Sequence, residues 1–269
     1  MKYAFKTQII CDVVLEKKSD TNALLSIGII SLYRPQQTIK CLESIYRSIC
    51  NNINYDIIIL DNFSDIETRK IILNYAKTKD NITVIYSPFN LRVSRSRNLL
   101  AEYTKSEYII FLDNDMEISS NYISELYKMV NRKTMISFGR IVENIRVLTI
   151  GRNIINNKID FSNDRLALTH PLTFKTSRVD IGPGGSTIFP VKIFNTINFD
   201  DELLDHEDWD FCLNLKKNYP GYIYMYNPLA VCIHTPMHDA SDIYGSIRRN
   251  NTSSQDARDI IYKKWGVEC

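Results

Sequence analysis

The sequence predicts an α/β fold, in which helices cover both faces of a largely parallel sheet. Between residues 24 and 131, short apolar runs alternate with helix-length amphipathic segments. The apolar runs are hydrophobic at successive positions, which is typical of strands buried on both faces. With 269 residues, of which 44% are hydrophobic and 24% charged, the chain can build one large packed domain or two small ones.

The first half is predicted to contain four strands, each followed by a helix. The run "LLSIGIISL" at residues 24–32 is the first strand, and Pro35 suits the first turn of a helix over residues 36–49. The other strands are expected at residues 55–61, 81–87 and 108–113, and the other helices at residues 66–77, 93–104 and 119–130.

The second half is less regular. Residues 134–151 have strand character, and residues 151–178 are polar and allow no assignment. "GPGGS", residues 182–186, predicts a tight loop before a short apolar strand. A helix is expected over residues 206–219, and two short strands around a turn at Asn227 and Pro228 are expected within residues 221–235.

Composition excludes several classes of protein. A net charge of +2 gives no global field of the kind that attracts nucleic acid. Six cysteines without a CxxC pair favour a reduced, cytosolic protein. We find neither a secretory signal nor a run of about 18 apolar residues, so the expectation is a cytoplasmic chain without a transmembrane segment. Peripheral association with the inner face of the membrane is compatible with the basic clusters near the C-terminus.

The strand at residues 108–113 ends in "FLDND", which places Asp113 and Asp115 on the same side of the chain. An EF-hand calcium loop that begins at Asp113 is excluded, because such a loop needs Gly where this sequence has Ile118 and Glu where it has Ser124. A phosphatase of the haloacid dehalogenase type would have Thr or Val at the position of Glu117. The pair taken alone leaves three interpretations open: a divalent cation that holds a nucleotide diphosphate, a simple helix cap and, as the weakest, a phosphatase nucleophile.

Seven segments together resemble, in order and spacing, the family 2 glycosyltransferases of GT-A fold. These are "SIGIISLYRPQQTIKCLESIYRS", "IIILDNFSD", "NLRVSRSRN", "FLDNDME", "GPGGSTIF", "FDDELLDHEDWDFCLNL" and "CIHTP", which span residues 24–236. The resemblance implies a three-layer α/β/α sandwich with a mostly parallel mixed sheet and an inverting, metal-dependent transfer from a nucleotide-sugar.

The resemblance also implies the residues that hold the donor. Asp61 would accept a hydrogen bond from the base, Arg97 would lie near the nucleotide, and Arg92 stands where Gly is usual. Asp115 would bind Mn²⁺ or Mg²⁺, Asp113 would contact ribose or metal-bound water, and His234 would be a further metal ligand with His238 as the alternative. The remaining donor contacts are expected from Ser31, Tyr33, Arg34, Asn114, Gly184, Gly185 and Trp209.

The residues that perform acid–base catalysis are expected in "HEDWD", residues 206–210. Family precedent makes Asp208 the base, with Glu207 and Asp210 as alternatives, because neighbouring acids can raise the pKa of a carboxyl group towards the working pH. These acids could equally favour the positive end of their helix. Trp209 could face a sugar or belong to the core.

The predicted organisation is one GT-A domain. Residues 1–23 form an N-terminal strand or extension, 24–131 the nucleotide-binding half, 132–236 the acceptor-binding half, and 237–269 a tail that closes over the site. We expect a hexosyl- or N-acetylhexosaminyltransferase that uses a UDP-sugar and a glycan acceptor of surface polysaccharide synthesis. A peptide or protein side chain is the second acceptor. A nucleotidyltransferase and a non-catalytic nucleotide-sugar-binding module are the alternatives from other classes.

Overall fold

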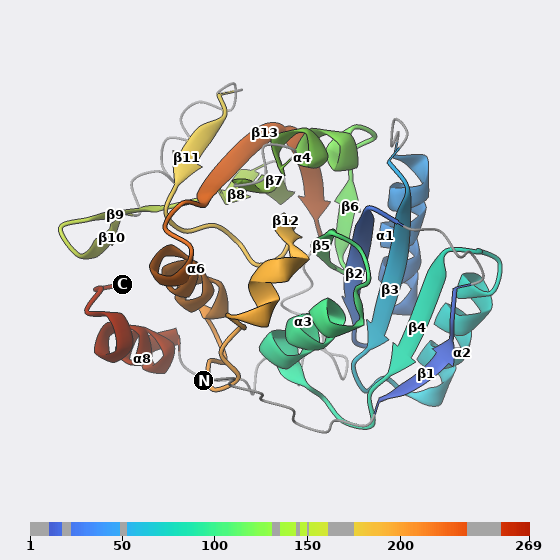
Figure 1. The fold of residues 1–269 in the computed structure, drawn as a ribbon. Coiled ribbons are helices and arrows are strands. Elements are labelled where there is room, and N and C mark those ends of the chain that lie inside the picture. Colours follow the sequence, from blue (N-terminus) through green and yellow to red (C-terminus); the bar gives the residue numbers. More distant parts are fainter. Residues whose placement is uncertain are drawn as a thin grey trace.

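One central sheet with helices on both faces forms the molecule (Figure 1). The computed structural model describes residues 11–17, 23–48, 53–130, 135–143, 146–149, 151–160, 175–235 and 254–269. Within these residues the sheet has eleven strands in the order β1-β4-β3-β2-β5-β12-β7-β13-β11, with β6 paired to β13 and β8 paired to β7. The expected α/β fold with a mixed sheet is therefore confirmed.

The first half of the chain builds the parallel side of the sheet. Its elements agree with the predicted ones to within a few residues, and Pro35 opens the first helix. The parallel strands are β2 (Leu25–Ser31), β3 (Tyr55–Asp61), β4 (Ile82–Tyr86) and β5 (Tyr108–Asp113). The helices between them are α1 (Pro35–Arg47), α2 (Ile66–Ala76) and α3 (Arg92–Tyr103), and β1 (Asp12–Leu15) adds an antiparallel edge to β4.

The second half extends the same sheet. Strand β12 (Thr187–Pro190) pairs antiparallel with both β5 and β7 (Met135–Glu143), so it joins the two halves. The long strand β13 (Ile223–His234) runs parallel to β7. The smaller strands of this sheet are β6 (Met116–Ile118), β8 (Arg146–Thr149) and β11 (Ser177–Val179). Strands β9 (Asn153–Ile155) and β10 (Lys158–Asp160) pair with each other in a separate two-stranded sheet. A short 3₁₀ helix, η1 (Val191–Asn195), follows β12.

The prediction of two short strands around Asn227 and Pro228 is wrong. Strand β13 is continuous, and its register against β7 shifts between Asn227 and Val231, which is a bulge. The Asn227 side chain accepts a hydrogen bond from the backbone N–H of Leu229 and donates one to the carbonyl of Glu125. Together with bonds from Asn121 Nδ2 to the carbonyl of Leu229 and from the Val231 N–H to Ser119 Oγ, they pair polar groups of the bulge, so the strand does not have to end there.

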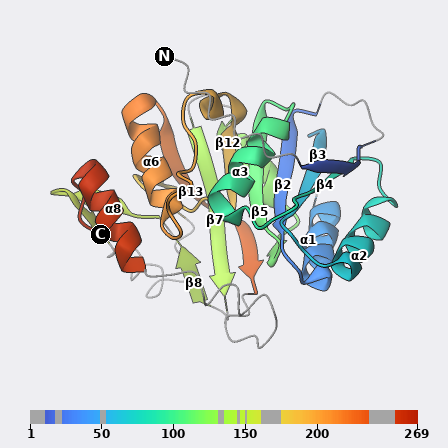
Figure 2. The ribbon, with the colours of Figure 1, turned by 90° about the horizontal axis from the view of Figure 1, so that it is seen from below.

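The apolar residues divide into two cores, one on each face of the sheet. Successive residues of β3 alternate between them: Ile57 and Ile59 face one core, and Ile58 and Leu60 face the other. Helices α1, α2 and α4 (Tyr122–Val130) cover the first core, and α3, α6 (Glu207–Asn218) and α8 (Ser254–Trp265) contribute to the second (Figure 2).

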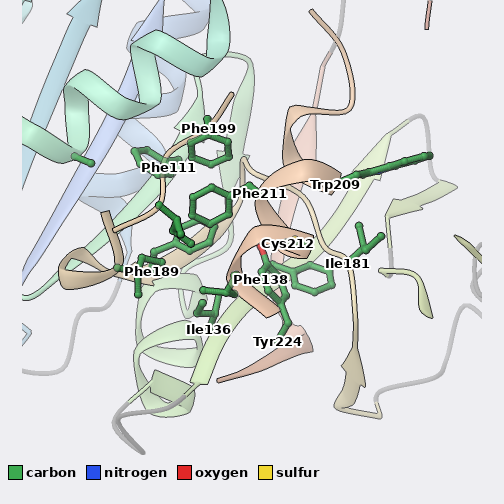
Figure 3. Close-up of a cluster of buried hydrophobic side chains, with 14 of the residues drawn as sticks. Phe111, Ile136, Phe138, Ile181, Phe189, Phe199, Trp209, Phe211, Cys212 and Tyr224 are labelled. Atoms are coloured by element: carbon green, nitrogen blue, oxygen red, sulfur yellow. The ribbon is translucent and has the colours of Figure 1, made fainter. Parts of the chain in front are cut away.

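The second core is rich in aromatic rings (Figure 3). Phe199 and Phe211 stack with ring centroids 4.2 Å apart, and Phe111 and Phe189 meet them from the sheet. This packing fixes helix α6 against β5 and β12. None of the helices in the described part of the chain has the length and apolar character to cross a membrane.

Helix α8 is an element that the sequence did not predict, since the last thirty residues looked like a polar tail. Ala257 and Ile261 are buried in the second core, and the helix lies beside α6 (Figure 1). The basic residues Arg248 and Arg249 of the predicted tail lie outside the described residues.

Candidate active site

A cavity of about 460 Å³ lies where the parallel strands end. Because β2, β3 and β5 are parallel and in register, Ser31 lies opposite Asp61 and Ile30 lies opposite Asp113. The carboxyl ends of such strands are where open α/β sheets bind ligands. We call this the first cavity. It is lined by the ends of β2 and β5, the start of α3, the loop before α6, and His234.

Asp113 and Asp115 both line the first cavity but differ in exposure. The Asp113 side chain is 37% exposed, whereas that of Asp115 is 5% exposed. The Asp115 Oδ1 atom is buried without a hydrogen-bond partner in the described part of the chain, 3.5 Å from His234 Nε2. The helix-cap interpretation is wrong, because strand β6 lies between Asp115 and helix α4.

Strand pairing brings His234 to Asp115. Strand β6 follows Asp115 directly and pairs with the end of β13, so that Met116 lies opposite His234. The backbone N–H of Thr235 also donates to the carbonyl of Asp115. Two residues far apart in sequence are thus fixed by backbone hydrogen bonds.

Glu143 supports His234 from the adjacent strand. Its Oε2 atom is 2.9 Å from His234 Nδ1. Burial lowers the pKa of His234, but the carboxylates of Asp115 and Glu143 outweigh this effect, so the pKa is raised overall. In neutral His234, donation from Nδ1 to Glu143 leaves the Nε2 lone pair free for a cation. Glu143 was not among the predicted site residues, although "SFGRIVE" is another strand that ends in a carboxylate.

The side chains around Asp115 fit a cation that is held only partly by protein. In the described residues, no three His, Cys, Asp or Glu side chains are grouped closely enough to hold a metal ion. Mg²⁺ sites of nucleotide enzymes typically use one or two carboxylates, and phosphate and water fill the other positions. An unpartnered Asp115 oxygen beside an imidazole is compatible with that arrangement. His238, the alternative ligand, lies outside the described residues.

Arg97 is a buried cation that links the two acidic groups of the site. Its Nη1 atom donates to Glu207 Oε1 at 2.8 Å, and its Nη2 atom is 3.6 Å from Asp113 Oδ1. Burial lowers the pKa of Arg97, but the surrounding carboxylates raise it further, so the guanidinium stays charged.

The glycine-rich loop packs on Arg97 and Asp113. A Cβ atom at Gly184 would lie 2.2 Å from Arg97 Nη1, and one at Gly185 would lie 2.9 Å from Asp113 Oδ2. Side chains at these positions would displace the two charged groups. We therefore assign both glycines to the close packing of the site, since neither lines the first cavity.

Asp61 lies below the floor of the cavity. It is completely buried, and its Oδ1 atom accepts hydrogen bonds from the backbone N–H of Ser64 and from Arg69 Nε. Its Oδ2 atom has no hydrogen-bond partner in the described residues. Burial raises the pKa of Asp61 despite these bonds. The next residue, Asn62, reaches the cavity and donates to Asn90 Oδ1 at 2.9 Å.

The side chains of Ser31 and Asn114 both form hydrogen bonds with Thr38. The hydroxyl groups of Ser31 and Thr38 are 3.0 Å apart, and Asn114 Nδ2 donates to Thr38 Oγ1 at 3.0 Å. This network attaches the ends of β2 and β5 to helix α1.

Three residues, in the loop after β2 and at the start of α3, adopt left-handed backbone conformations. Tyr33, Arg34 and Arg92 have φ values of 54°, 52° and 60°. Tyr33 N–H donates to Ser64 Oγ, which joins the loops after β2 and β3. Arg92 takes the glycine-like conformation that its position implied, and its side chain lines the first cavity.

A second cavity of about 310 Å³ adjoins the first at the start of α6. Asp205 and Glu207 line both cavities, whereas Asp208, Arg152 and Arg258 line only the second. Burial and the charge of Glu207 raise the pKa of Asp208 to about 7, while Arg97 and Arg152 act against this shift. Arg152 and Arg258 were not among the predicted site residues, because neither belongs to a motif.

Trp209 and Asp210 point away from the first cavity. Trp209 is 3% exposed, and the His206 ring stacks on it at 4.0 Å, so the indole is a core residue beside the second cavity. Asp210 lines neither cavity. Its Oδ1 atom accepts hydrogen bonds from Trp265 Nε1 and Lys264 Nζ of helix α8. Asp210 therefore anchors α8.

Sequence comparison gives one family and two curated relatives. The profile of a family described as Glycosyl transferase family 2 matches residues 26–193. An uncharacterized glycosyltransferase of Haemophilus influenzae is 24% identical over 90% of this chain and 77% of its own length. A teichoic acid poly(glycerol phosphate) polymerase of Staphylococcus epidermidis is 24% identical over 88% of this chain but only 31% of its own length.

Two solved structures share the fold. The crystal structure of GalNAc-T7 with UDP, GalNAc and Mn²⁺ superposes with a TM-score of 0.66 at 13% identity, over 90% of this chain and 48% of that one. The structure of S. aureus TarS 1–349 in complex with UDP-GlcNAc gives a TM-score of 0.60 at 14% identity, over 89% of this chain and 64% of that one. The fold is thus of the GT-A type.

Proposed function

The chain belongs to glycosyl transferase family 2, and we propose that it moves a hexosyl or N-acetylhexosaminyl group from a UDP-sugar to a glycan hydroxyl, with inversion and with help from a divalent cation. Membership of this family makes the protein a glycosyltransferase. The phosphatase, nucleotidyltransferase and binding-module alternatives are therefore dropped.

One observation carries the proposal: the cavity with Asp113, Asp115 and His234 shares the wall residue Glu207 with the cavity that contains Asp208. A donor in the first cavity would then meet an acceptor in the second at Glu207. The structures of GalNAc-T7 with UDP and Mn²⁺ and of TarS with UDP-GlcNAc support a UDP-linked donor.

The first cavity would hold the donor diphosphate and its cation. Asp115 and His234 would be the protein ligands of Mn²⁺ or Mg²⁺, and Asp113 would contact ribose or metal-bound water. When bound, the cation supplies neutralising charge to the departing diphosphate. Asn62, Asn90 and Arg92 would surround the nucleotide. Contact between Asp61 and the base would require its buried Oδ2 atom to become accessible.

Asp208 would act as the base in the second cavity. The acceptor hydroxyl would attack the anomeric carbon as Asp208 takes its proton, and the bond from that carbon to the diphosphate would break with its electron pair on the leaving oxygen. A carboxyl group that titrates near neutral pH is suited to this work. Glu207 would orient Arg97 and keep the pKa of Asp208 high.

The S. epidermidis relative is named as a teichoic acid poly(glycerol phosphate) polymerase, and this name supports a polymer acceptor over a peptide side chain.

Hydrolysis of a panel of nucleotide-sugars with Mn²⁺ tests the proposal. We expect turnover of a UDP-sugar that falls by about a hundredfold or more in Asp115→Ala, because the leaving group loses its cation. Asp12→Ala on the exposed strand β1 is the control and should behave like the wild type. If no donor is turned over, or if Asp115→Ala is as active as the control, the proposal fails. Asp208→Asn should abolish transfer and retain donor binding.

A further inference from the structure

The second cavity contains a cation that the proposed mechanism does not use. On the basis of the proposed function, we propose that this cavity is an acceptor subsite in which Arg258 binds an anionic group of the acceptor, either a phosphate or a carboxylate.

The cavity is assembled from three separate parts of the chain. Residues 205–209 at the start of α6 form its base, Arg152 comes from the segment before β9, and Arg258 comes from α8. Because Asp208 and Arg258 line the same cavity, an acceptor with its hydroxyl group at Asp208 would lie in the cavity that also contains Arg258. The cavity is therefore large and polar enough to hold part of an acceptor beside the reacting hydroxyl.

Some hydrogen-bond donors of the Arg258 guanidinium have no partner in the described residues. Its Nε atom lies 3.4 Å from His206 Nε2, and in the described residues no carboxylate forms an ion pair with it. The Ser254 hydroxyl lies 2.8 Å from the same His206 nitrogen. Burial and the charge of Arg258 lower the pKa of His206, so the imidazole is neutral and its Nε2 atom can accept from Arg258. Within the described part of the chain, the two terminal nitrogens of the guanidinium have no partner and can bind a ligand in the forked arrangement that suits phosphate or carboxylate.

None of the three acids that line the cavity forms an ion pair with Arg258 in the described residues. Glu207 is paired with Arg97 at 2.8 Å. Asp205 Oδ1 accepts from the backbone N–H of His206, and Asp208 Oδ1 accepts from that of Trp209. Arg258 is thus a cation whose charge is not cancelled by a direct carboxylate partner.

Helix α8 holds Arg258 in a fixed place. At the other end of the helix, Trp265 and Lys264 are bound to the buried Asp210 of α6, and Ala257, next to Arg258, is packed in the core. A guanidinium held on a docked helix loses little further freedom when it binds an anion.

Three small molecules with one carbon skeleton test the proposal on the full chain with UDP and Mn²⁺ present. Glycerol 3-phosphate carries a phosphate, glycerate carries a carboxylate, and glycerol is neutral. Isothermal titration calorimetry measures each dissociation constant, and the variants described below report whether binding depends on the second cavity. We expect at least one anion to bind at least tenfold more tightly than glycerol, and the tighter anion identifies the acceptor chemistry.

The variants assign binding to Arg258. Arg258→Gln should weaken anion binding by about tenfold or more, and Arg258→Lys should retain part of it. Lys263→Gln removes the same charge from an exposed position of α8 and should leave binding unchanged. If Arg258→Gln does not fold, the comparison of Arg258→Lys with the wild type decides.

Equal binding of glycerol and both anions, or anion binding that is insensitive to Arg258, overturns the inference. Binding of UDP to the wild type separates this result from failure of the proposed function. If UDP binds in the presence of Mn²⁺ but neither anion does, only the anionic subsite is wrong. If UDP does not bind, the proposed transferase site itself fails.

Discussion

Glu207 and Asp208 are neighbours in sequence, yet they occupy different positions in the site. Glu207 forms part of the wall of both cavities and holds Arg97, whereas Asp208 faces only the second cavity. The charge of Glu207 disfavours ionisation of Asp208 and so raises the pKa of Asp208. We therefore assign the positioning of Arg97 to Glu207 and proton transfer to Asp208.

The pH dependence of transfer should report this pair. With the pKa of Asp208 at about 7, the base is protonated and inactive below that pH, so kcat should rise as the pH increases through 7. Glu207→Gln removes the negative charge that raises the pKa of Asp208, whereas the positive charge of Arg97 still lowers that pKa. The pH at which kcat rises should therefore move to a lower value. Glu202→Gln, an exposed neighbour, is the control. A pH profile that stays the same in Glu207→Gln would contradict the assignment of Asp208.

The close contact of Gly184 with Arg97 leads to a second prediction at the scale of single residues. Gly184→Ala places a methyl group 2.2 Å from Arg97 Nη1, so the guanidinium must move from Glu207 and Asp113. We expect a loss of about 1–3 kcal/mol in the free energy of unfolding, together with lower transfer activity. Urea unfolding measures the first and a transfer assay the second. Gly221→Ala, where no atom lies within 4 Å of the added Cβ, should change neither.

At the scale of elements, helix α8 is joined to α6 through a buried carboxylate. Asp210 is completely buried and receives hydrogen bonds from both Trp265 and Lys264. A buried carboxylate that loses a donor is costly, so this bond should contribute measurably to the docking of α8.

Trp265→Phe should therefore destabilise the protein by about 1–3 kcal/mol, because one oxygen of Asp210 loses its indole donor. Tyr262→Phe removes a hydroxyl from the same helix at a side chain that is 55% exposed, and it should change stability by less than about 0.5 kcal/mol. Urea unfolding of the two variants gives the comparison. Similar stabilities would show that Asp210 does not anchor the helix.

The first half of the fold was predictable because its signals are local. Apolar runs of strand length, Pro35 and amphipathic segments place β2 to β5 and α1 to α3 within a few residues. The bulge of β13 was not predictable, since Asn227 and Pro228 carry a turn signal, and the bonds that keep the strand continuous come partly from Glu125, far away in sequence. Helix α8 was missed because only two of its residues are buried, which leaves a weak periodic pattern.

The candidate site was predictable where a motif marks it. The strand-end pattern located Asp113 and Asp115, and the family resemblance added Arg97, His234 and Asp208. Glu143 and Arg258 reach the site only through strand pairing and helix docking, which a single sequence does not reveal. Their roles, like those of the motif residues, rest on the tests described above.

At the scale of the whole molecule, donor binding should raise the thermal stability in a metal-dependent way. At a UDP concentration one hundred times the dissociation constant, binding stabilises a protein by about 2.7 kcal/mol, which corresponds to a rise of about 5 °C or more in Tm. Removal of Mn²⁺ with EDTA should abolish most of this shift, since Asp115 and His234 would bind UDP through the cation. Differential scanning fluorimetry measures it, with uridine as the control without a diphosphate. An equal shift in EDTA would exclude a cation between the protein and the diphosphate.

The pairing of β12 with both β5 and β7 has a consequence for how the molecule could be divided. The first half of the chain, for which we propose nucleotide binding, should not fold as an independent module, because the free edge of β5 would be exposed and Asp115 would lose His234. Fragments separated between residues 130 and 135 should therefore regain nucleotide binding only when they are mixed. Exchanging halves between family members to create new donor and acceptor combinations would require β12 and the end of β13 to be transferred with the first half.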